Sequence, residues 1–184
     1  MKIQELYNIV IEPITDRISR SNGLNQFAQR RAKFEGWLKV ELIDIFVKFN
    51  INALPEIDRI DISFDDVAIE LKTANTNIGY ENVISTTRPI TKNTADIIED
   101  IACLQTKNHL YKFVIFVVFP IHHENSFWQK QFQRIQVCLE SIMHKEFTFD
   151  NNVPAVIYIG KVPNLIIAEK TIGSQFPGCS RQGR

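Results

Sequence analysis

Apolar and polar residues alternate along residues 59–72, and this alternation is the clearest structural signal in the chain. Successive side chains of a β-strand point to opposite faces, so alternation of this kind is typical of strands. A two-residue turn at Asp65 and Asp66 would fold the segment into a hairpin in which Asp61 faces Glu70. One face then carries Ile60, Ile62, Phe64, Val67, Ile69 and Leu71, and the other carries Arg59, Asp61, Ser63, Ala68, Glu70 and Lys72. A slip of one residue would turn one apolar set to the wrong face, so the pattern predicts this register.

Helical spacing of apolar residues and runs of β-branched residues predict the remaining elements. We predict helices over residues 2–12, 24–49, 93–105 and 126–144, the first ended by Pro13. The last begins at Ser126, which lies three residues before Gln129 as in a capping box. We predict strands or extended pieces at residues 51–54, 82–86, 111–120, 153–159 and 165–169. Residues 74–92, rich in Asn, Thr and Gly, are otherwise expected to form a long loop.

This order of elements predicts an α/β fold with a central mixed β-sheet flanked by helices on both faces. The hairpin supplies antiparallel neighbours, whereas the strand at residues 111–120 follows a helix and is expected to lie parallel to a neighbour. A chain of 184 residues is long enough for one complete core. We expect a single domain over residues 1–184 whose core covers about residues 24–170.

Composition narrows the class of protein. Hydrophobic residues make up 45% and charged residues 23%, which is ordinary for a globular protein and argues against disorder. The formal net charge is zero, so contacts with nucleic acid would depend on local basic clusters. The longest apolar run, residues 113–121, is about half the roughly 20 residues of a membrane-spanning helix. Residues 1–6 do not show the positively charged start followed by an apolar run that a secretion signal needs, so we do not expect export. We therefore expect a cytoplasmic protein with no membrane partner.

Two carboxylates that face each other across a hairpin need a neutralising partner. Like charges opposite one another destabilise a sheet by roughly 0.2–1 kcal/mol. A bound divalent cation would remove this repulsion between Asp61 and Glu70, and Lys72 lies on the same face two residues further on. Such a surface can hold a metal ion beside a phosphodiester. A Glu-x-Lys on a strand is in itself more often an exposed ion pair.

Asp61 and the run Glu70-Leu71-Lys72 together resemble the PD-(D/E)XK nuclease superfamily, which includes many restriction endonucleases. The preceding acidic helix, the helix at 93–105 and the strand at 111–120 fit the same order, so the resemblance covers roughly residues 24–144. Many members have proline where this chain has Ile60. The resemblance implies a restriction endonuclease-like fold.

The resemblance also implies roles for individual residues. Asp61, Glu70 and the main-chain carbonyl of Leu71 would bind Mg²⁺, for which Mn²⁺ can substitute. Lys72 would orient or deprotonate the attacking water. The family's helical acidic residue would be Glu35 or Glu41, both of which touch the apolar arc of the predicted helix, with Glu35 at the more family-like spacing.

The expected function is therefore that of a Mg²⁺-dependent nuclease acting on DNA, of the restriction or repair kind. Cutting both strands would require a second subunit, so we expect a homodimer. The alternatives are a catalytically inactive nucleic-acid-binding or protein-interaction domain of the same fold, and an unrelated interaction protein with a solvated hairpin. Phosphate contacts are expected from basic residues that could equally be ordinary surface charges: Arg30, Arg31, Lys33, Lys39, Arg88 and Lys92.

Overall fold

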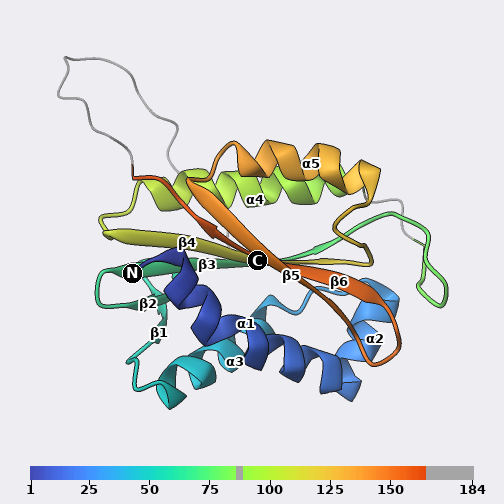
Figure 1. The fold of residues 1–184 in the computed structure, drawn as a ribbon, viewed down its shortest axis with the longest axis horizontal. Coiled ribbons are helices and arrows are strands. Elements are labelled where there is room, and N and C mark those ends of the chain that lie inside the picture. Colours follow the sequence, from blue (N-terminus) through green and yellow to red (C-terminus); the bar gives the residue numbers. More distant parts are fainter. Residues whose placement is uncertain (86–88, 165–184) are drawn as a thin grey trace.

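The computed structural model describes residues 1–85 and 89–164, which form an α/β structure (Figure 1). Its helices are α1 (Ile3–Arg20), α2 (Asn22–Arg30), α3 (Glu35–Lys48), α4 (Ile90–Gln105) and α5 (Ser126–Gln136). Its strands are β1 (Leu54–Ile57), β2 (Ile60–Phe64), β3 (Val67–Asn75), β4 (Tyr111–Phe119), β5 (Ser141–Thr148) and β6 (Pro154–Lys161). The expected mixed sheet is confirmed, with strand order β1-β2-β3-β4-β6-β5.

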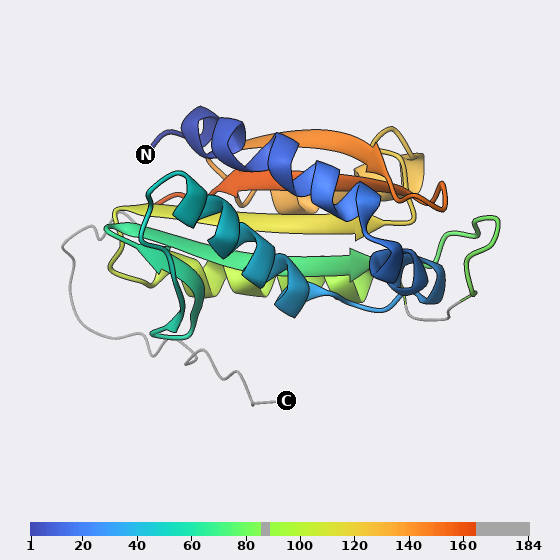
Figure 2. The same cartoon turned by 90° about the horizontal axis from the view of Figure 1, so that it is seen from below.

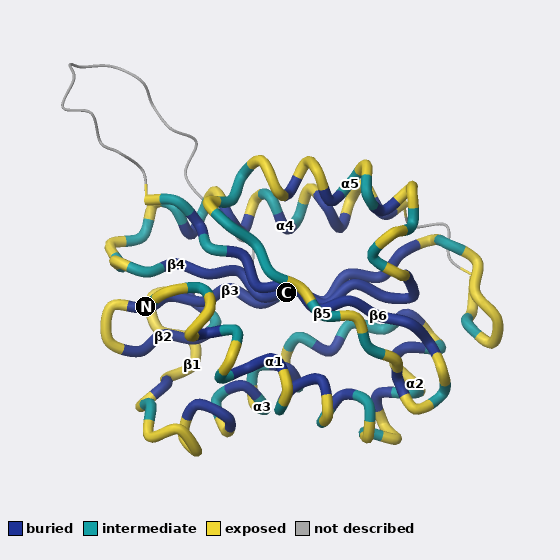
Figure 3. Tube along the Cα trace, viewed as in Figure 1, coloured by how far each residue is buried: buried dark blue, intermediate teal, exposed yellow. Residues whose placement is uncertain are grey.

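Helices cover both faces of this sheet, as the sequence predicts. Helices α1, α2 and α3 lie on one face and α4 and α5 on the other (Figures 1 and 2). Each face buries its own apolar cluster. The central strands are buried while the outer sides of the helices are exposed (Figure 3). Strand β4 pairs in parallel with β3 and antiparallel with β6, and its side chains are buried from Lys112 to Phe119.

The predicted hairpin register is confirmed. Strands β2 and β3 pair Phe64 with Val67, Ser63 with Ala68 and Ile62 with Ile69. The assignment of Ile60 to the same face as Ile62 is wrong, because Ile60 packs in the cluster beneath α4 and α5. The pairing of β2 with β3 ends at Ile62, and the two residues before Ile60 have positive φ angles. Ile60 is therefore not held to the alternation of the hairpin.

The predicted single helix over residues 24–49 is wrong, because the chain forms α2 and α3 with a break between them. Arg31 adopts a left-handed conformation with φ of 57°, and its N–H bonds to the carbonyls at the end of α2. Glycine and asparagine usually occupy such a position, so an arginine there leaves little trace in a sequence pattern.

Two other helix boundaries are also wrong. Helix α1 continues through Pro13 to Arg20. A proline inside a helix costs about 3 kcal/mol or more, and here buried side chains on both sides of it, including Val10 and Ile14, stabilise the helix. Helix α5 ends at Gln136, and residues 141–148 form strand β5 along β6 instead of more helix. Pairing with a distant strand overrides the local pattern there.

Two of the shorter predicted strands differ from the structure. The extended piece at 51–54 is displaced to β1, and residues 82–85 form no strand. The strand expected at 165–169 lies outside the described residues. Among the helices that the structure describes, none is long and apolar enough to cross a membrane.

Candidate functional site: carboxylates where strands β2 and β3 separate

Strand β2 leaves β3 just beyond the pair formed by Ile62 and Ile69. In a regular hairpin of this register, the main-chain N–H of Leu71 would donate to the main chain of β2. It donates instead to Oδ2 of Asp61, at 2.8 Å. The Asp61 carboxylate thus takes the place of a ladder hydrogen bond at the point where the strands separate.

Glu35 likewise accepts a main-chain N–H of β3, two residues beyond the one that Asp61 accepts. The N–H groups of Leu71 and Thr73 point to the same side of β3, because alternate residues of a strand share a direction. Oε1 of Glu35 accepts the N–H of Thr73 at 3.0 Å. The hydroxyl of Thr73 in turn accepts the N–H of Phe34 at 3.1 Å, which ties the start of α3 to β3. Asp61 and Glu35 therefore line one edge of β3 side by side.

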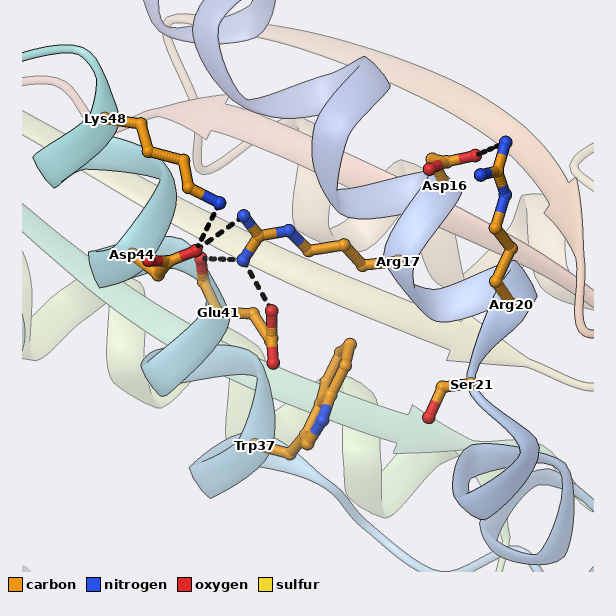
Figure 4. Close-up of a pocket in the computed structure, with 8 residues that line it drawn as sticks. All are labelled: Asp16, Arg17, Arg20, Ser21, Trp37, Glu41, Asp44 and Lys48. Carbon is orange, nitrogen blue, oxygen red and sulfur yellow. Dashed lines mark hydrogen bonds and ion pairs between the residues drawn. The ribbon is translucent and has the colours of Figure 1, made fainter.

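Glu41, the other candidate for the helical acidic residue, lies elsewhere. It pairs with Arg17 of α1 at 2.5 Å, and Arg17 also contacts Asp44 at 2.6 Å (Figure 4). Lys48 completes this network with a contact to Asp44 at 3.0 Å. Of the two glutamates left open by the sequence, Glu35 is the one that contacts β3, and Glu41 joins α3 to α1.

Asp61 and Glu70 lie close together, although the pairing of β2 with β3 ends at Ile62 and Ile69 and does not extend to the predicted pair of Asp61 and Glu70. The carboxyl of Glu70 is hydrogen-bonded to that of Asp61, and Glu70 is buried. Lys39 of α3 places its ammonium 2.8 Å from Oδ1 of Asp61 and also pairs with Glu56 of β1. Burial by itself would raise the pKa of Asp61, but hydrogen bonds from Lys39, Leu71 and Glu70, with the charge of Lys39, hold that pKa below its usual value.

The predicted common face of Asp61 and Lys72 is wrong, because Asp61 pairs with Lys39 of α3 whereas Lys72 points to the helical layer of α4 on the other face of the sheet. Its ammonium lies 2.7 Å from Oδ2 of Asp100 on α4, and both side chains are largely buried. Asp100 was not among the sequence candidates. It lies on the same arc of α4 as the buried Ile97 and Leu104. A carboxylate on an apolar arc normally has a charged or hydrogen-bonded partner, so its position was a usable signal.

Of the predicted phosphate-contact residues that the structure describes, Lys39 and Lys33 lie at this site, and both pair with its carboxylates. Arg31 is buried and donates to the carbonyls of residues 76, 78 and 84, which makes it a structural residue. Lys33 lies 3.8 Å from Glu35 and is half-buried. Arg30 and Lys92 are exposed on α2 and α4, and Arg88 lies outside the described residues.

The donor set suits a hard divalent cation held mainly by water. Asp61 and Glu70 offer carboxylate oxygens, and the Leu71 carbonyl lies next to them in the chain. Mg²⁺ typically binds through one or two carboxylates and keeps several water ligands. Within residues 1–85 and 89–164, no three His, Cys, Asp or Glu side chains form a group that could hold a metal ion. A metal here would therefore rely on this carboxylate pair.

The structure is therefore that of an α/β protein in which Asp61 and Glu70 lie where the inner strands β2 and β3 separate. Comparisons of the chain with known protein families, with curated proteins and with solved structures returned no match. A functional assignment therefore depends on the geometry of the site.

Proposed function

We propose that this protein is a Mg²⁺-dependent nuclease that hydrolyses DNA phosphodiester bonds and belongs to the restriction endonuclease-like class. The observation that carries the proposal is the position of Asp61, which accepts the N–H of Leu71, the residue next to Glu70, where β2 leaves β3. Glu35 accepts the main-chain N–H of Thr73, two residues beyond Leu71 on β3. Lys72 follows Glu70 by two residues. These are the residues that the PD-(D/E)XK resemblance names.

The order of elements around the site supports the same proposal. Helix α3 carries the acidic residue, strands β1, β2 and β3 follow as an antiparallel set, and α4 leads to the parallel strand β4. This is the sequence of elements that the resemblance implies. Asp61 and Glu70 therefore lie on adjacent central strands, and the rigidity of the sheet favours a precise site.

Each side chain has a definable task in this proposal. Asp61, Glu70 and the Leu71 carbonyl would hold Mg²⁺, which when bound lowers the pKa of a coordinated water and stabilises charge on the attacked phosphate. Lys72 shares the α4 side of β3 with Glu70, since alternate residues of a strand point the same way. From there it would orient the attacking water or offset phosphate charge, and Asp100 positions its ammonium at 2.7 Å. Glu35 would keep the edge of β3 in place through the N–H of Thr73.

A second candidate is a domain of the same fold that binds nucleic acid or protein without cutting. The observation that favours it is the state of the site residues. Both oxygens of Asp61 accept hydrogen bonds from within the protein, and the ammonium of Lys72 pairs with Asp100. A site satisfied in this way can be stable with no further ligand.

Cleavage of supercoiled, linear and branched DNA with Mg²⁺ or Mn²⁺ tests the proposal. The wild type should cut at least one DNA form, and Glu70→Ala should lose about a hundredfold or more of that rate, as expected when a residue of the reacting centre is removed. Glu41→Gln is the matched control, because that glutamate lies on α3 away from the site, and its rate should stay within about twofold of wild type.

Two outcomes would count against a nuclease. Absence of cleavage with every DNA form would favour the non-cutting domain. Equal cleavage by wild type and Glu70→Ala would point to a contaminating enzyme. A nuclease that cuts both strands is expected to sediment as a homodimer, since one compact domain provides one site.

A further inference from the structure

Lys39 forms an ion pair with Asp61, a carboxylate of the proposed metal site. It lies in the second turn of α3, and its side chain is only 17% exposed. Its ammonium is 2.8 Å from Oδ1 of Asp61, and Oδ2 of the same carboxylate accepts the N–H of Leu71. Each oxygen of Asp61 therefore has a partner within the protein.

The position of Lys39 follows from the charges around it. Asp61 and Glu70 bring two acidic groups together in a largely buried place, and a buried charge without a partner is costly. Lys72 lies on the other side of β3, where it pairs with Asp100. Lys39 therefore provides the positive charge for Asp61.

We propose that Lys39 is an internal counter-ion that a divalent cation must displace from Asp61, so that it stabilises the metal-free protein and weakens metal binding. This inference rests on the proposed function, because it takes Asp61 as a metal ligand. A metal ion on Oδ1 and an ammonium at hydrogen-bonding distance from the same oxygen would repel each other strongly at so short a distance.

Glu56 gives the displaced ammonium a second carboxylate to bind. Lys39 already contacts this glutamate of β1, whose side chain is 67% exposed. A small rotation about the flexible lysine side chain would move the ammonium from Asp61 toward Glu56 without leaving it unpaired. Displacement therefore requires no rearrangement of α3, whose start is anchored to β3 through Thr73.

Calorimetric titration with Mn²⁺ tests the proposal in the full-length chain. Lys39→Met keeps the length of the side chain and removes its charge. This variant should bind Mn²⁺ about tenfold or more tightly than wild type, which corresponds to about 1.4 kcal/mol. Asp61→Asn should abolish the binding in both backgrounds. Lys48→Met removes a lysine of the same helix that pairs with Asp44, and it should bind as wild type does.

Thermal unfolding separates this role from a merely structural one. Without metal, Lys39→Met should unfold at a lower temperature than wild type, because the carboxylate pair loses its counter-ion. Saturating Mn²⁺ should narrow the difference. A purely structural lysine would lower the Tm of the variant without tightening its binding of Mn²⁺.

Equal or weaker binding of Mn²⁺ by Lys39→Met would overturn the proposal, as would absence of binding by every variant. The DNA cleavage assay reports on the proposed function separately. Cleavage by the wild type with unchanged metal affinity in Lys39→Met would refute the role of Lys39 alone. Tighter metal binding by Lys39→Met with no cleavage by either protein would refute the nuclease alone.

Discussion

Replacement of Arg31 by methionine should be among the most destabilising single changes in the chain. Arg31 joins α2 to α3, and its side chain is buried. Its guanidinium donates to the carbonyls of Thr76, Ile78 at 2.7 Å and Ile84 at 2.6 Å. It thereby ties the segment after β3 to the connection between two helices. Burial lowers the pKa of Arg31.

The size of the effect follows from these three hydrogen bonds. A hydrogen bond to a charged group contributes roughly 1.5–3 kcal/mol, and an acceptor left buried and unpaired costs roughly 1–3 kcal/mol. The carbonyls of Ile78 and Ile84 are part-buried and can recover water, whereas the bond to Thr76 is buried. We therefore expect Arg31→Met to lower the free energy of unfolding by about 3–5 kcal/mol. Arg31→Lys should recover only part of this, because one ammonium cannot reproduce the planar fork.

Urea unfolding followed by circular dichroism measures the loss, and limited proteolysis should show faster cleavage within residues 76–84. Arg30→Met is the control, since its exposed side chain ends the same helix, and it should cost less than about 0.5 kcal/mol. Equal stability of the two variants would refute the structural role of Arg31. Loss of DNA binding by Arg31→Met with unchanged stability would show that the residue contacts phosphate.

Two further predictions concern a cluster between β5, β6 and α5, where the ring of His144 stacks on that of His123 at 3.8 Å. Burial and the nearby His123 lower the pKa of His144 in the folded protein. As the pH falls, the unfolded chain therefore binds a proton at this residue before the folded protein does. The free energy of unfolding should be unaffected by this residue above a pH of about 6.5 and should decrease as the pH drops below it. His144→Phe should flatten this dependence in urea unfolding between about pH 8 and 5, and an unchanged slope would contradict the reasoning. Tyr158→Phe should cost about 1–3 kcal/mol, because the buried Trp128 N–H loses its acceptor at 2.6 Å. Tyr80→Phe, at an exposed hydroxyl, should cost less than about 0.5 kcal/mol, and equal losses would show that the buried hydroxyl has no special weight.

Local pattern was sufficient for the elements whose side chains sort cleanly between two environments. The hairpin register follows from alternation, because a slip of either strand by one residue would turn its apolar set to the wrong face. The continuous apolar run of β4 predicts a strand buried on both faces. The mixed sheet with helices on both sides follows from the order of such elements. The three pairs from Phe64 with Val67 to Ile62 with Ile69 were therefore predictable from the chain alone, whereas the pairing of Asp61 with Glu70 was not, because β2 leaves β3 before it.

Tertiary contacts decided what local pattern left open. The choice between Glu35 and Glu41 depends on where α3 begins, and that depends on the left-handed Arg31 and on the bond between Phe34 and Thr73. Strand β5 exists because β6 offers a free edge, not because its own residues demand it.

The partners of the charged residues were also decided by tertiary contacts. Lys39 and Asp100 contact Asp61 and Lys72 only after two helices pack on opposite faces of the sheet. Sequence periodicity reports which face of an element is buried. It carries little information on which charged group, distant along the chain, will be opposite, because that depends on how elements are placed against each other in three dimensions.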